Sequence, residues 1–310
     1  MKKILVSSLI IFTGLFHISF SQINLKLLVE STSESFANPQ ISKSGNILAY
    51  TTVNYTGIYL YNLTTGEKKE LTNETAAGFG MIWSNNDSKI IARPAVFENK
   101  RRFNGIVSYD INNLNREVLS EFSTSLSHLP SITENALIIP EKHGIKTSNL
   151  NGDNSILSGG KSVFLYNDKI AVYDIQSQNL SFLTPVANER YLNVKSNPAG
   201  DLVSFEVIGG NLYLVNISGN NLIDLGKGYR ATWSPDGKYI VFMVTEDDGH
   251  YILSSKLVVA DRQGNIVKTV FDNSSFLPSD PIFLGNNYTV AFADMISGNI
   301  YSFDIEGGLE

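Results

Sequence analysis

The sequence predicts an all-β fold built from one repeated unit. From about Leu25 onward, short runs rich in β-branched and aromatic residues alternate with clusters of turn residues. No long stretch shows the 3.6-residue periodicity of an amphipathic helix. Two short motifs recur roughly 40 residues apart, and self-similarity at such a spacing is typical of propellers and solenoids.

The first recurring motif is a strand end, a tight turn and a second strand. Its clearest copy is 231–242, which contains Trp-Ser-Pro-Asp-Gly, and weaker copies lie at 39–50, 81–91 and 193–205. Pro235 presets the turn's φ, Asp236 can bond back to the backbone, and Gly237 accepts a positive φ. We therefore expect Asp236 to build a hairpin rather than a binding site.

The second motif is an Asp or Asn that ends a strand and opens a turn. It occurs at Asn62, Asp110, Asn149, Asp174, Asn216, Asp261 and Asp304. Successive marks are roughly 40 residues apart, except for a much shorter step from Asn149 to Asp174. The fourth unit is therefore predicted to have only three strands, at 162–167, 169–175 and 179–184.

Together the two motifs resemble the WD40-like repeats of TolB-type β-propellers, and the resemblance covers 25–307. It implies a β-propeller of mostly four-stranded blades, with seven blades favoured and six as the alternative. The last unit, 281–304, stops after its third strand, whereas 25–29 precedes the first inner strand. We therefore expect the N-terminal strand to close the ring, which leaves no long open edge.

Residues 1–21 are predicted to be a secretory signal peptide, and 22–310 a single propeller domain. Lys2 and Lys3 precede an apolar stretch that ends in the small-residue exit 19–21. An uncleaved membrane anchor is the alternative. After cleavage we expect a periplasmic or secreted protein without membrane insertion, because no other segment is long and apolar enough to span a bilayer.

Composition excludes several classes of function. The chain has no cysteine, so neither a disulfide framework nor a thiolate metal site is possible. The formal net charge of −6, which becomes more negative without the signal's two lysines, argues against nucleic acid as a partner.

The resemblance also implies where ligands would bind. In such propellers the segments before each inner strand, and those between second and third strands, lie at one end of the channel, which we call the mouth face. The tight turns lie at the other end, the turn face. The ligand-binding candidates on the mouth face are Arg101, Arg102, Arg190, Tyr191, Tyr229, Arg230, Asp247, Asp248 and His250.

These candidates follow from their chemistry. Arg190-Tyr191 and Tyr229-Arg230 each combine a cation with an aromatic plane, which suits carboxylates, sugars or peptides. Packing of the arginine stem on its own blade is the alternative. The acidic run 246–250 suits a cation or a ligand's hydroxyl groups, and the alternative is a solvated turn.

Three histidines, His128, His143 and His250, are also expected on the mouth face. With nearby carboxylates they are possible ligands of a divalent cation such as zinc or manganese, but they lack the short paired spacing of a zinc motif. The chain has no Gly-x-Ser-x-Gly elbow and no His-Glu-x-x-His motif. We therefore expect no cofactor.

The sequence thus predicts an exported, non-catalytic propeller. Its partner would be a protein, peptide or carbohydrate of the cell envelope, bound by the mouth face. The alternative is a metal-assisted polysaccharide lyase or hydrolase that uses the three histidines.

Overall fold

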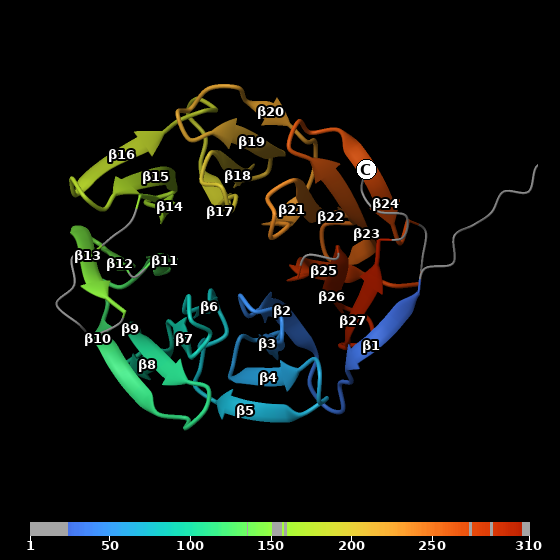
Figure 1. The fold of residues 1–310 in the computed structure, drawn as a ribbon, viewed down its shortest axis with the longest axis horizontal. Helices are drawn as coiled ribbons and strands as arrows, with labels where there is room; N and C mark the ends of the chain where they lie inside the picture. Colours follow the sequence, from blue (N-terminus) through green and yellow to red (C-terminus); the bar gives the residue numbers. More distant parts are fainter. Residues whose placement is uncertain are drawn as a thin grey trace, which may run out of the picture.

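The fold is a seven-bladed β-propeller (Figure 1). The computed structural model describes residues 24–134, 136–150, 157, 160–272, 275–285 and 288–305. These residues form strands and turns, with no helix long and apolar enough to cross a membrane. The prediction of an all-β propeller is confirmed, with seven blades rather than six. The predicted signal peptide lies outside the described residues.

Five blades have four strands or more, and in four of them, blades 1, 2, 5 and 6, the strands run outward from the central axis in chain order (Figure 1). Blade 1 contains β2 (Phe36–Ile41), β3 (Ile47–Thr52), β4 (Ile58–Asn62) and β5 (Lys68–Thr72). Blade 2 contains β6 (Ile82–Trp83), β7 (Lys89–Ala92), β9 (Arg101–Asp110) and β10 (Arg116–Ser123), with an additional strand β8 (Ala95–Glu98) that pairs with β9. Blade 5 contains β17 (Tyr191–Ser196), β18 (Leu202–Val207), β19 (Leu212–Asn216) and β20 (Ile223–Asp224). Blade 6 contains β21 (Tyr229–Trp233), β22 (Tyr239–Asp247), β23 (Ile252–Asp261) and β24 (Ile266–Val270).

Blades 3 and 4 each have three strands among the described residues. Blade 3 contains β11 (Ser131–Thr133), β12 (Ala136–Glu141) and β13 (Gly144–Asn149). Blade 4 contains β14 (Lys161–Tyr166), β15 (Lys169–Asp174) and β16 (Asn179–Leu183), which confirms the three strands predicted for the short unit. All seven Asp and Asn marks are the last residues of strands.

The innermost strand of blade 4 runs in the opposite direction to its neighbours. The turn after β14 reaches the mouth face, because the Asn167 backbone N–H donates to Nε2 of His128, 3.2 Å away, just before β11 begins. β11 therefore leaves the mouth face, whereas β14 arrives there. Among the described residues, blade 4 thus has no strand that runs from the mouth face to the turn face beside the axis, in keeping with the short step between Asn149 and Asp174.

The N-terminal strand closes the ring, as predicted. Blade 7 consists of β25 (Pro278–Leu284), β26 (Thr289–Asp294), β27 (Ile300–Asp304) and, as its outer strand, β1 (Leu25–Val29). β1 pairs antiparallel with β27, and Val29 at its end is fully buried. The backbone N–H of Phe36 then donates to the Gly298 carbonyl, so blade 1 begins against blade 7.

The hydrophobic core is divided among the joints between blades. Each of the seven clusters of buried apolar side chains draws its members from two neighbouring blades. The joint between blades 6 and 7, for example, packs Val241 and Val259 against Phe283 and Phe292. Because burial of apolar area is the main favourable term in folding, a blade is stabilised mostly by its two neighbours.

The Trp-Ser-Pro-Asp-Gly turn has the structural role expected from its sequence. The Ser234 hydroxyl donates to Oδ1 of Asp236 over 2.6 Å and accepts the Tyr239 backbone N–H, and Gly237 has a φ of 68°. Tyr288 of blade 7 donates its hydroxyl to Oδ2 of the same carboxylate. Asp236 therefore holds the turn together and ties it to the next blade.

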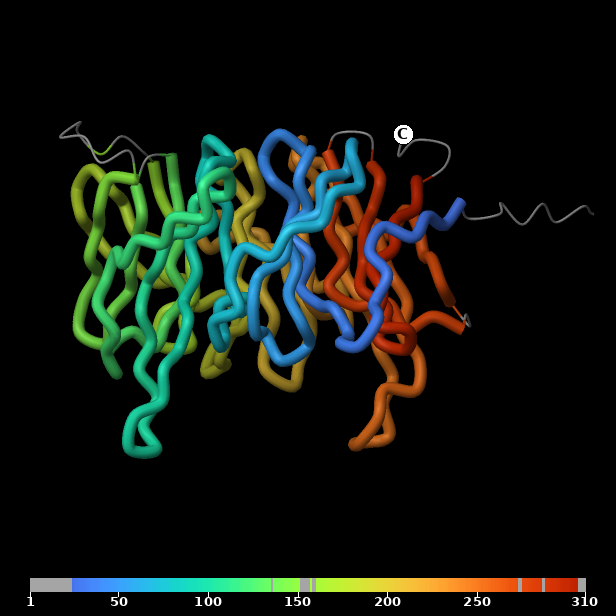
Figure 2. Tube along the Cα trace, turned by 90° about the horizontal axis from the view of Figure 1, so that it is seen from below, coloured from blue at the N-terminus to red at the C-terminus, as the bar shows by residue number. Residues whose placement is uncertain are grey.

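Two long hairpins stand out beyond the other loops at one end of the ring (Figure 2). One is formed by β8 and the first part of β9, and the other by the adjoining ends of β22 and β23. Both lie between the second and third strands of their blades, so they extend from the mouth face. Blades 2 and 6 lie across the ring from one another (Figure 1). The additional strand β8 was not predicted.

We expect Gly80→Ala to destabilise the protein more than Gly200→Ala. Both glycines have a positive φ, 68° and 72°, so each alanine pays about 1 kcal/mol in backbone strain. At Gly80 the new Cβ would also clash with the Leu129 side chain, whereas it meets nothing within 4 Å at Gly200. Urea unfolding should show an additional loss of roughly 1–3 kcal/mol for Gly80→Ala. Equal losses would contradict this packing of blade 2 on the segment before blade 3.

Candidate functional site

The inner strands of four successive blades are kinked near the mouth face. In β17, β21, β25 and β2 the pairing register shifts around one residue with a positive φ: Asn193 (47°), Arg230 (56°), Asp280 (48°) and Asn38 (49°). Such a bulge bends a strand and redirects a side chain. In blade 2 the corresponding residue is Gly80, with a φ of 68°.

These kinks connect neighbouring blades through carboxylates. The backbone N–H of Arg230 donates to Oε1 of Glu206 in blade 5, at 2.7 Å. The backbone N–H of Asn38 likewise donates to Oδ2 of Asp280 in blade 7, at 3.1 Å. The positive φ turns each N–H out of its own sheet ladder, and the carboxylate of the preceding blade accepts it.

Side chains extend these bonds into a chain of contacts that we call the polar chain: Asn193, Glu206, Arg230, Asp280 and Asn38. The Asn193 amide donates to Glu206 at 2.8 Å, and Nε of Arg230 lies 3.6 Å from Oδ1 of Asp280. Asn38 then donates its side-chain amide to the Gly78 carbonyl at 2.8 Å, on the segment that leads into blade 2. The polar chain thus links blades 5, 6, 7 and 1 at the mouth.

Arg230 is the unusual member of the polar chain. Glycine, asparagine and aspartate tolerate a left-handed backbone, but for arginine it costs about 1–2 kcal/mol. Strain of this kind gathers at functional sites, where the surrounding structure compensates for it. Here a guanidinium occupies the position at which blades 1, 2, 5 and 7 have Asn, Gly, Asn and Asp, so the strained backbone holds a long cationic side chain where those blades have a short side chain or none.

The Arg230 guanidinium is held at the mouth and remains open to solvent. Its Nη2 donates to the Tyr55 hydroxyl at 3.3 Å, and its side chain is 40% exposed. Burial opposes the positive charge, but Asp280 and Tyr55 outweigh this effect and raise the pKa of Arg230. Nη1 has no acceptor among the described residues. Arg230 therefore offers a fixed cation with a free donor.

Two further charged groups lie beside the polar chain. Glu206 is 5% exposed, and this burial raises its pKa despite the two donors that it accepts. Lys195 projects from β17 with Nζ 3.1 Å from Oγ1 of Thr232. Desolvation by the surrounding protein lowers the pKa of Lys195, against the attraction of Asp280 and Glu206. Cations and carboxylates thus alternate at the mouth.

A cavity of about 470 Å³ opens beside Arg230, between blades 5 and 6. Its polar lining comes from the polar chain and from the β22–β23 hairpin, and its apolar lining from Leu192, Met243 and Ile252. Tyr229 and Tyr251 contribute aromatic surface. The lining is thus part apolar and part polar, and the convergence of several polar groups on an apolar surface is a feature of binding sites.

Four of the nine ligand-binding candidates come together in this cavity. They are Tyr229, Arg230, Asp247 and His250. Asp248 lies next to them in the hairpin turn, where it accepts the backbone N–H groups of Tyr251 and His250 at 2.7 and 2.9 Å. These two bonds lower the pKa of Asp248, whose side chain is solvent-exposed. Asp248 therefore caps the turn, in line with the alternative reading of the acidic run.

The candidate pairs Arg190-Tyr191 and Arg101-Arg102 lie outside this cavity. Arg190 forms an exposed ion pair with Asp168, at 2.8 Å, over blade 4. Tyr191 is 1% exposed, packs edge-on against Phe205, and donates its hydroxyl to the Val186 carbonyl. The structure thus places Tyr191 in the joint between blades 4 and 5, because it begins an inner strand and points outward into the core. Its ring offers no surface to a ligand at the mouth.

Arg101 and Arg102 lie on the β8–β9 hairpin, across the ring from the cavity. Both are exposed. Arg102 donates through Nε to the Asn104 side chain at 2.9 Å, and neither arginine has an ion pair among the described residues.

The three histidines lie on the mouth face but are not gathered into one site. His128 precedes blade 3, His143 lies between β12 and β13, and His250 is on the β22–β23 hairpin. Within the described residues, no group of three or more His, Asp or Glu side chains is placed to hold a metal ion. His128 contacts Ser127 through Nδ1, and burial lowers its pKa.

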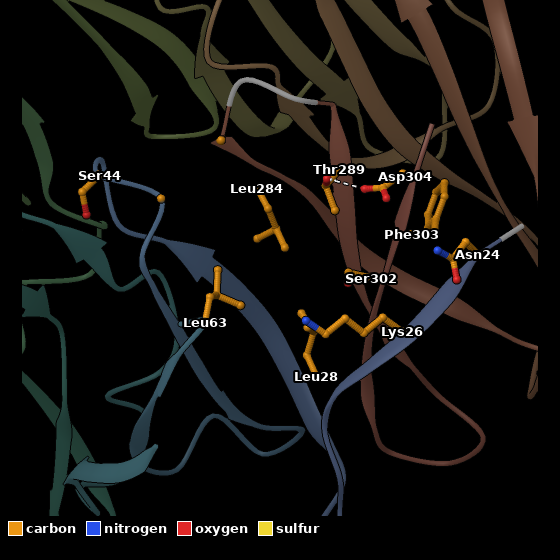
Figure 3. Close-up of a pocket in the computed structure, with 12 residues that line it drawn as sticks. Asn24, Lys26, Leu28, Ser44, Leu63, Leu284, Thr289, Ser302, Phe303 and Asp304 are labelled. Atoms are coloured by element: carbon orange, nitrogen blue, oxygen red, sulfur yellow. Dashed lines mark hydrogen bonds between the residues drawn. The ribbon is translucent and has the colours of Figure 1, made fainter. Parts of the chain in front are cut away.

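A second cavity, of about 460 Å³, lies on the turn face where the ring closes (Figure 3). Lys26 and Leu28 of β1, Phe303 and Asp304 of β27, and the first turn of blade 1 line it. None of the residues predicted to bind a ligand lies there.

Sequence reasoning missed most of the polar chain. Glu206, Asp280, Asn193 and Asn38 lie within strands, where a polar residue attracts little notice. A usable signal is present in the aligned repeats: Asn38, Gly80, Asn193 and Arg230 each stand four residues before the Ser or Asn that opens the first turn. This shared polar or glycine position marks the kink.

We expect Glu206→Gln to be tolerated and Glu206→Ala to be damaging. Glutamine retains an acceptor for the Asn193 amide and the Arg230 backbone N–H, whereas alanine leaves both donors without a partner, which costs about 1–3 kcal/mol. The two variants should be compared with the natural protein by urea unfolding at neutral pH.

Glu206→Gln should also change the pH dependence of stability. Because the folded protein raises the pKa of Glu206, its contribution is fully present below the pKa of the unfolded chain and is lost as the pH rises through the folded pKa. The natural protein should lose stability over that window relative to Glu206→Gln. A constant difference from pH 4 to 8 would show that Glu206 is not buried as described.

Comparison with known proteins supports the fold. No protein-family model matches the sequence, and no curated protein matches it. Among solved structures, the β-propeller domain of Cps50 (Swd1) from Myceliophteria thermophila aligns over 91% of this chain and 99% of that chain, with a TM-score of 0.65 and 9% identity. A putative TolB from Agrobacterium tumefaciens aligns over 91% and 96%, with a TM-score of 0.55 and 14% identity.

TolB from Acinetobacter baumannii is a more distant match, with a TM-score of 0.49, 16% identity, and coverage of 89% of this chain and 65% of that chain. The resemblance predicted from the repeats is therefore confirmed at the level of the fold. The chain has a seven-bladed β-propeller fold, similar to the propeller domain of Cps50 (Swd1) and to the putative TolB from Agrobacterium tumefaciens.

Proposed function

We propose that this protein is an exported, non-catalytic propeller that binds a segment of another polypeptide in the cavity between blades 5 and 6. The observation that carries the proposal is Arg230, a strained, solvent-open cation fixed at the wall of a mixed apolar and polar cavity. Export to the periplasm or beyond the cell rests on the predicted signal peptide at 1–21.

The cavity suits a polypeptide for three reasons. Leu192, Met243 and Ile252 offer apolar surface for a side chain. The free Nη1 of Arg230 can donate to a carbonyl or carboxylate of the ligand. Tyr229 and Tyr251 are aromatic residues of the kind that protein interfaces favour.

A non-catalytic role is preferred to the metal-assisted enzyme because the enzyme needs convergent ligands. The described residues contain no group of three suitable side chains in one place. The carboxylates of the polar chain instead accept backbone N–H and amide donors, and Asp280 also pairs with Arg230. Such an arrangement supports a fixed binding surface.

Arg230→Asn separates binding from folding. Asparagine tolerates the left-handed backbone and retains the N–H that donates to Glu206, so relief of strain should offset the lost contact with Asp280 to within about 1 kcal/mol. Binding should fall by at least about tenfold, since a charge-assisted hydrogen bond is lost. His250→Ala tests the opposite wall, and His143→Ala is its matched control on the same face outside the cavity.

The mature protein and these variants would be used to recover partners from the cell envelope, with quantitative mass spectrometry and then titration of the recovered protein. We expect a protein that binds the natural chain and His143→Ala but not Arg230→Asn. Partners that bind Arg230→Asn and His250→Ala as tightly as the natural chain would place the site elsewhere. Binding to a glycan panel that depends on Arg230, without a protein partner, would replace the polypeptide with a carbohydrate ligand.

A further inference from the structure

The two hairpins of the mouth face carry opposite charge. The β8–β9 hairpin presents Lys100, Arg101 and Arg102, with Glu98 as its single acid. The β22–β23 hairpin presents Glu246, Asp247 and Asp248, with no lysine or arginine in its tip. The chain therefore has a basic projection and an acidic projection on one face.

None of these charges is neutralised within the described part of the chain. The seven ion pairs found there involve none of the residues named above. At the base of the β8–β9 hairpin, burial and the neighbouring charge of Arg102 together lower the pKa of Arg93 to about 10. Arg102 thus adds to the positive potential at the base of this hairpin.

Both hairpins also expose large apolar side chains. Phe97 is 63% exposed on the β8–β9 hairpin, and Tyr251 and Leu253 are 75% and 63% exposed on the β22–β23 hairpin. Apolar groups surrounded by charges are typical of protein interaction sites. These tips extend farther than the rest of the face (Figure 2), so they are the first parts that an approaching protein meets.

We propose that the two hairpins join two copies of this chain face to face, with the β8–β9 hairpin of each copy against the β22–β23 hairpin of the other. A twofold axis parallel to the mouth face and midway between the two hairpins places each hairpin of one copy against the other hairpin of the second copy. A single rotation therefore brings both opposite-charge pairs together. In the same operation Phe97 of one copy approaches Tyr251 and Leu253 of the other. A second copy therefore complements both the charges of the two hairpins and their exposed apolar side chains.

This dimer does not depend on the binding of a polypeptide in the cavity, although both use the β22–β23 hairpin, whose Asp247 and Tyr251 also line the cavity. Two pairs of hairpin tips make a small interface, so the dimer should be weak and sensitive to salt. The rest of the two mouth faces would lie apart, leaving access from the side.

Charge reversal provides the test. Arg101→Glu with Arg102→Glu makes both hairpins acidic, and Glu246→Lys with Asp247→Lys makes both basic. Asp248 is left unchanged because it caps the hairpin turn. Lys43→Glu with Lys68→Glu is the matched control, since these exposed lysines lie on the turn face and on an outer strand and change the net charge by the same amount as the arginine pair.

Sedimentation equilibrium of the mature chain should show dimers at about 50 mM salt and mainly monomers at about 500 mM. Each reversed variant should dimerise at least about tenfold more weakly, and the lysine control should match the natural chain. An equimolar mixture of the two reversed variants should form dimers again, because each acidic hairpin then meets a basic one. This recovery also shows that both variants are folded.

A natural chain that stays monomeric at low salt and about 0.5 mM protein would overturn the proposal, as would a dimer that neither reversal weakens. Reversed variants that remain monomeric when mixed would also overturn it, provided that their far-ultraviolet spectra match the natural chain. The readout is self-association alone, so its failure leaves the proposed cavity ligand untouched.

Discussion

The arrangement of the mouth face depends on a backbone N–H that leaves its own sheet. At Arg230 and Asn38 a positive φ turns this group toward a carboxylate of the preceding blade, Glu206 or Asp280. A buried carboxylate is expensive unless its hydrogen bonds are complete. Glu206 and Asp280 each accept a backbone donor, and Arg230 lies between them. Fold and site are therefore coupled, because the bonds that hold blades together also fix the guanidinium.

Most of the fold could be predicted from the sequence, because the same kinds of turn residue recur in successive blades of a propeller. Asn62 and Asp261 end third strands in different blades for the same physical reason: the side chain accepts backbone N–H groups of the turn that follows. The seven Asp and Asn strand ends therefore predicted the number of blades, and the run 25–29 predicted that the N-terminal strand closes the ring. The direction of β14 and the additional strand β8 were missed, since neither carries a turn signal that differs from an ordinary hairpin.

The candidate site was predicted only in part. Arg230 and Tyr229 were found because an arginine beside an aromatic residue is visible in sequence, but the same pattern at Arg190-Tyr191 belongs to an exposed ion pair and a buried core ring. Which member of such a pair faces solvent depends on the register of the inner strand. Glu206 could not be recognised, because its role arises from a backbone donor in another blade.

The mouth face has two levels, which meet at the β22–β23 hairpin. Near the axis, the polar chain holds a cation at the edge of the cavity between blades 5 and 6. Farther out, two oppositely charged hairpins stand above that surface, where their charges reach other macromolecules before close contact. The position of Arg230 at the inner level depends on burial and backbone geometry. The attraction exerted by the hairpins at the outer level depends on their charge and weakens as salt is added.

Native-state hydrogen exchange of the backbone amides at Arg230 and Asn38 tests the central claim most directly. The account predicts protection close to that of amides in the inner ladders, because each N–H is held by a carboxylate of the neighbouring blade. The amides of His250 and Tyr251, in the exposed turn capped by Asp248, should exchange much faster. Exchange at Arg230 and Asn38 as fast as in that turn would show that the polar chain does not exist in solution.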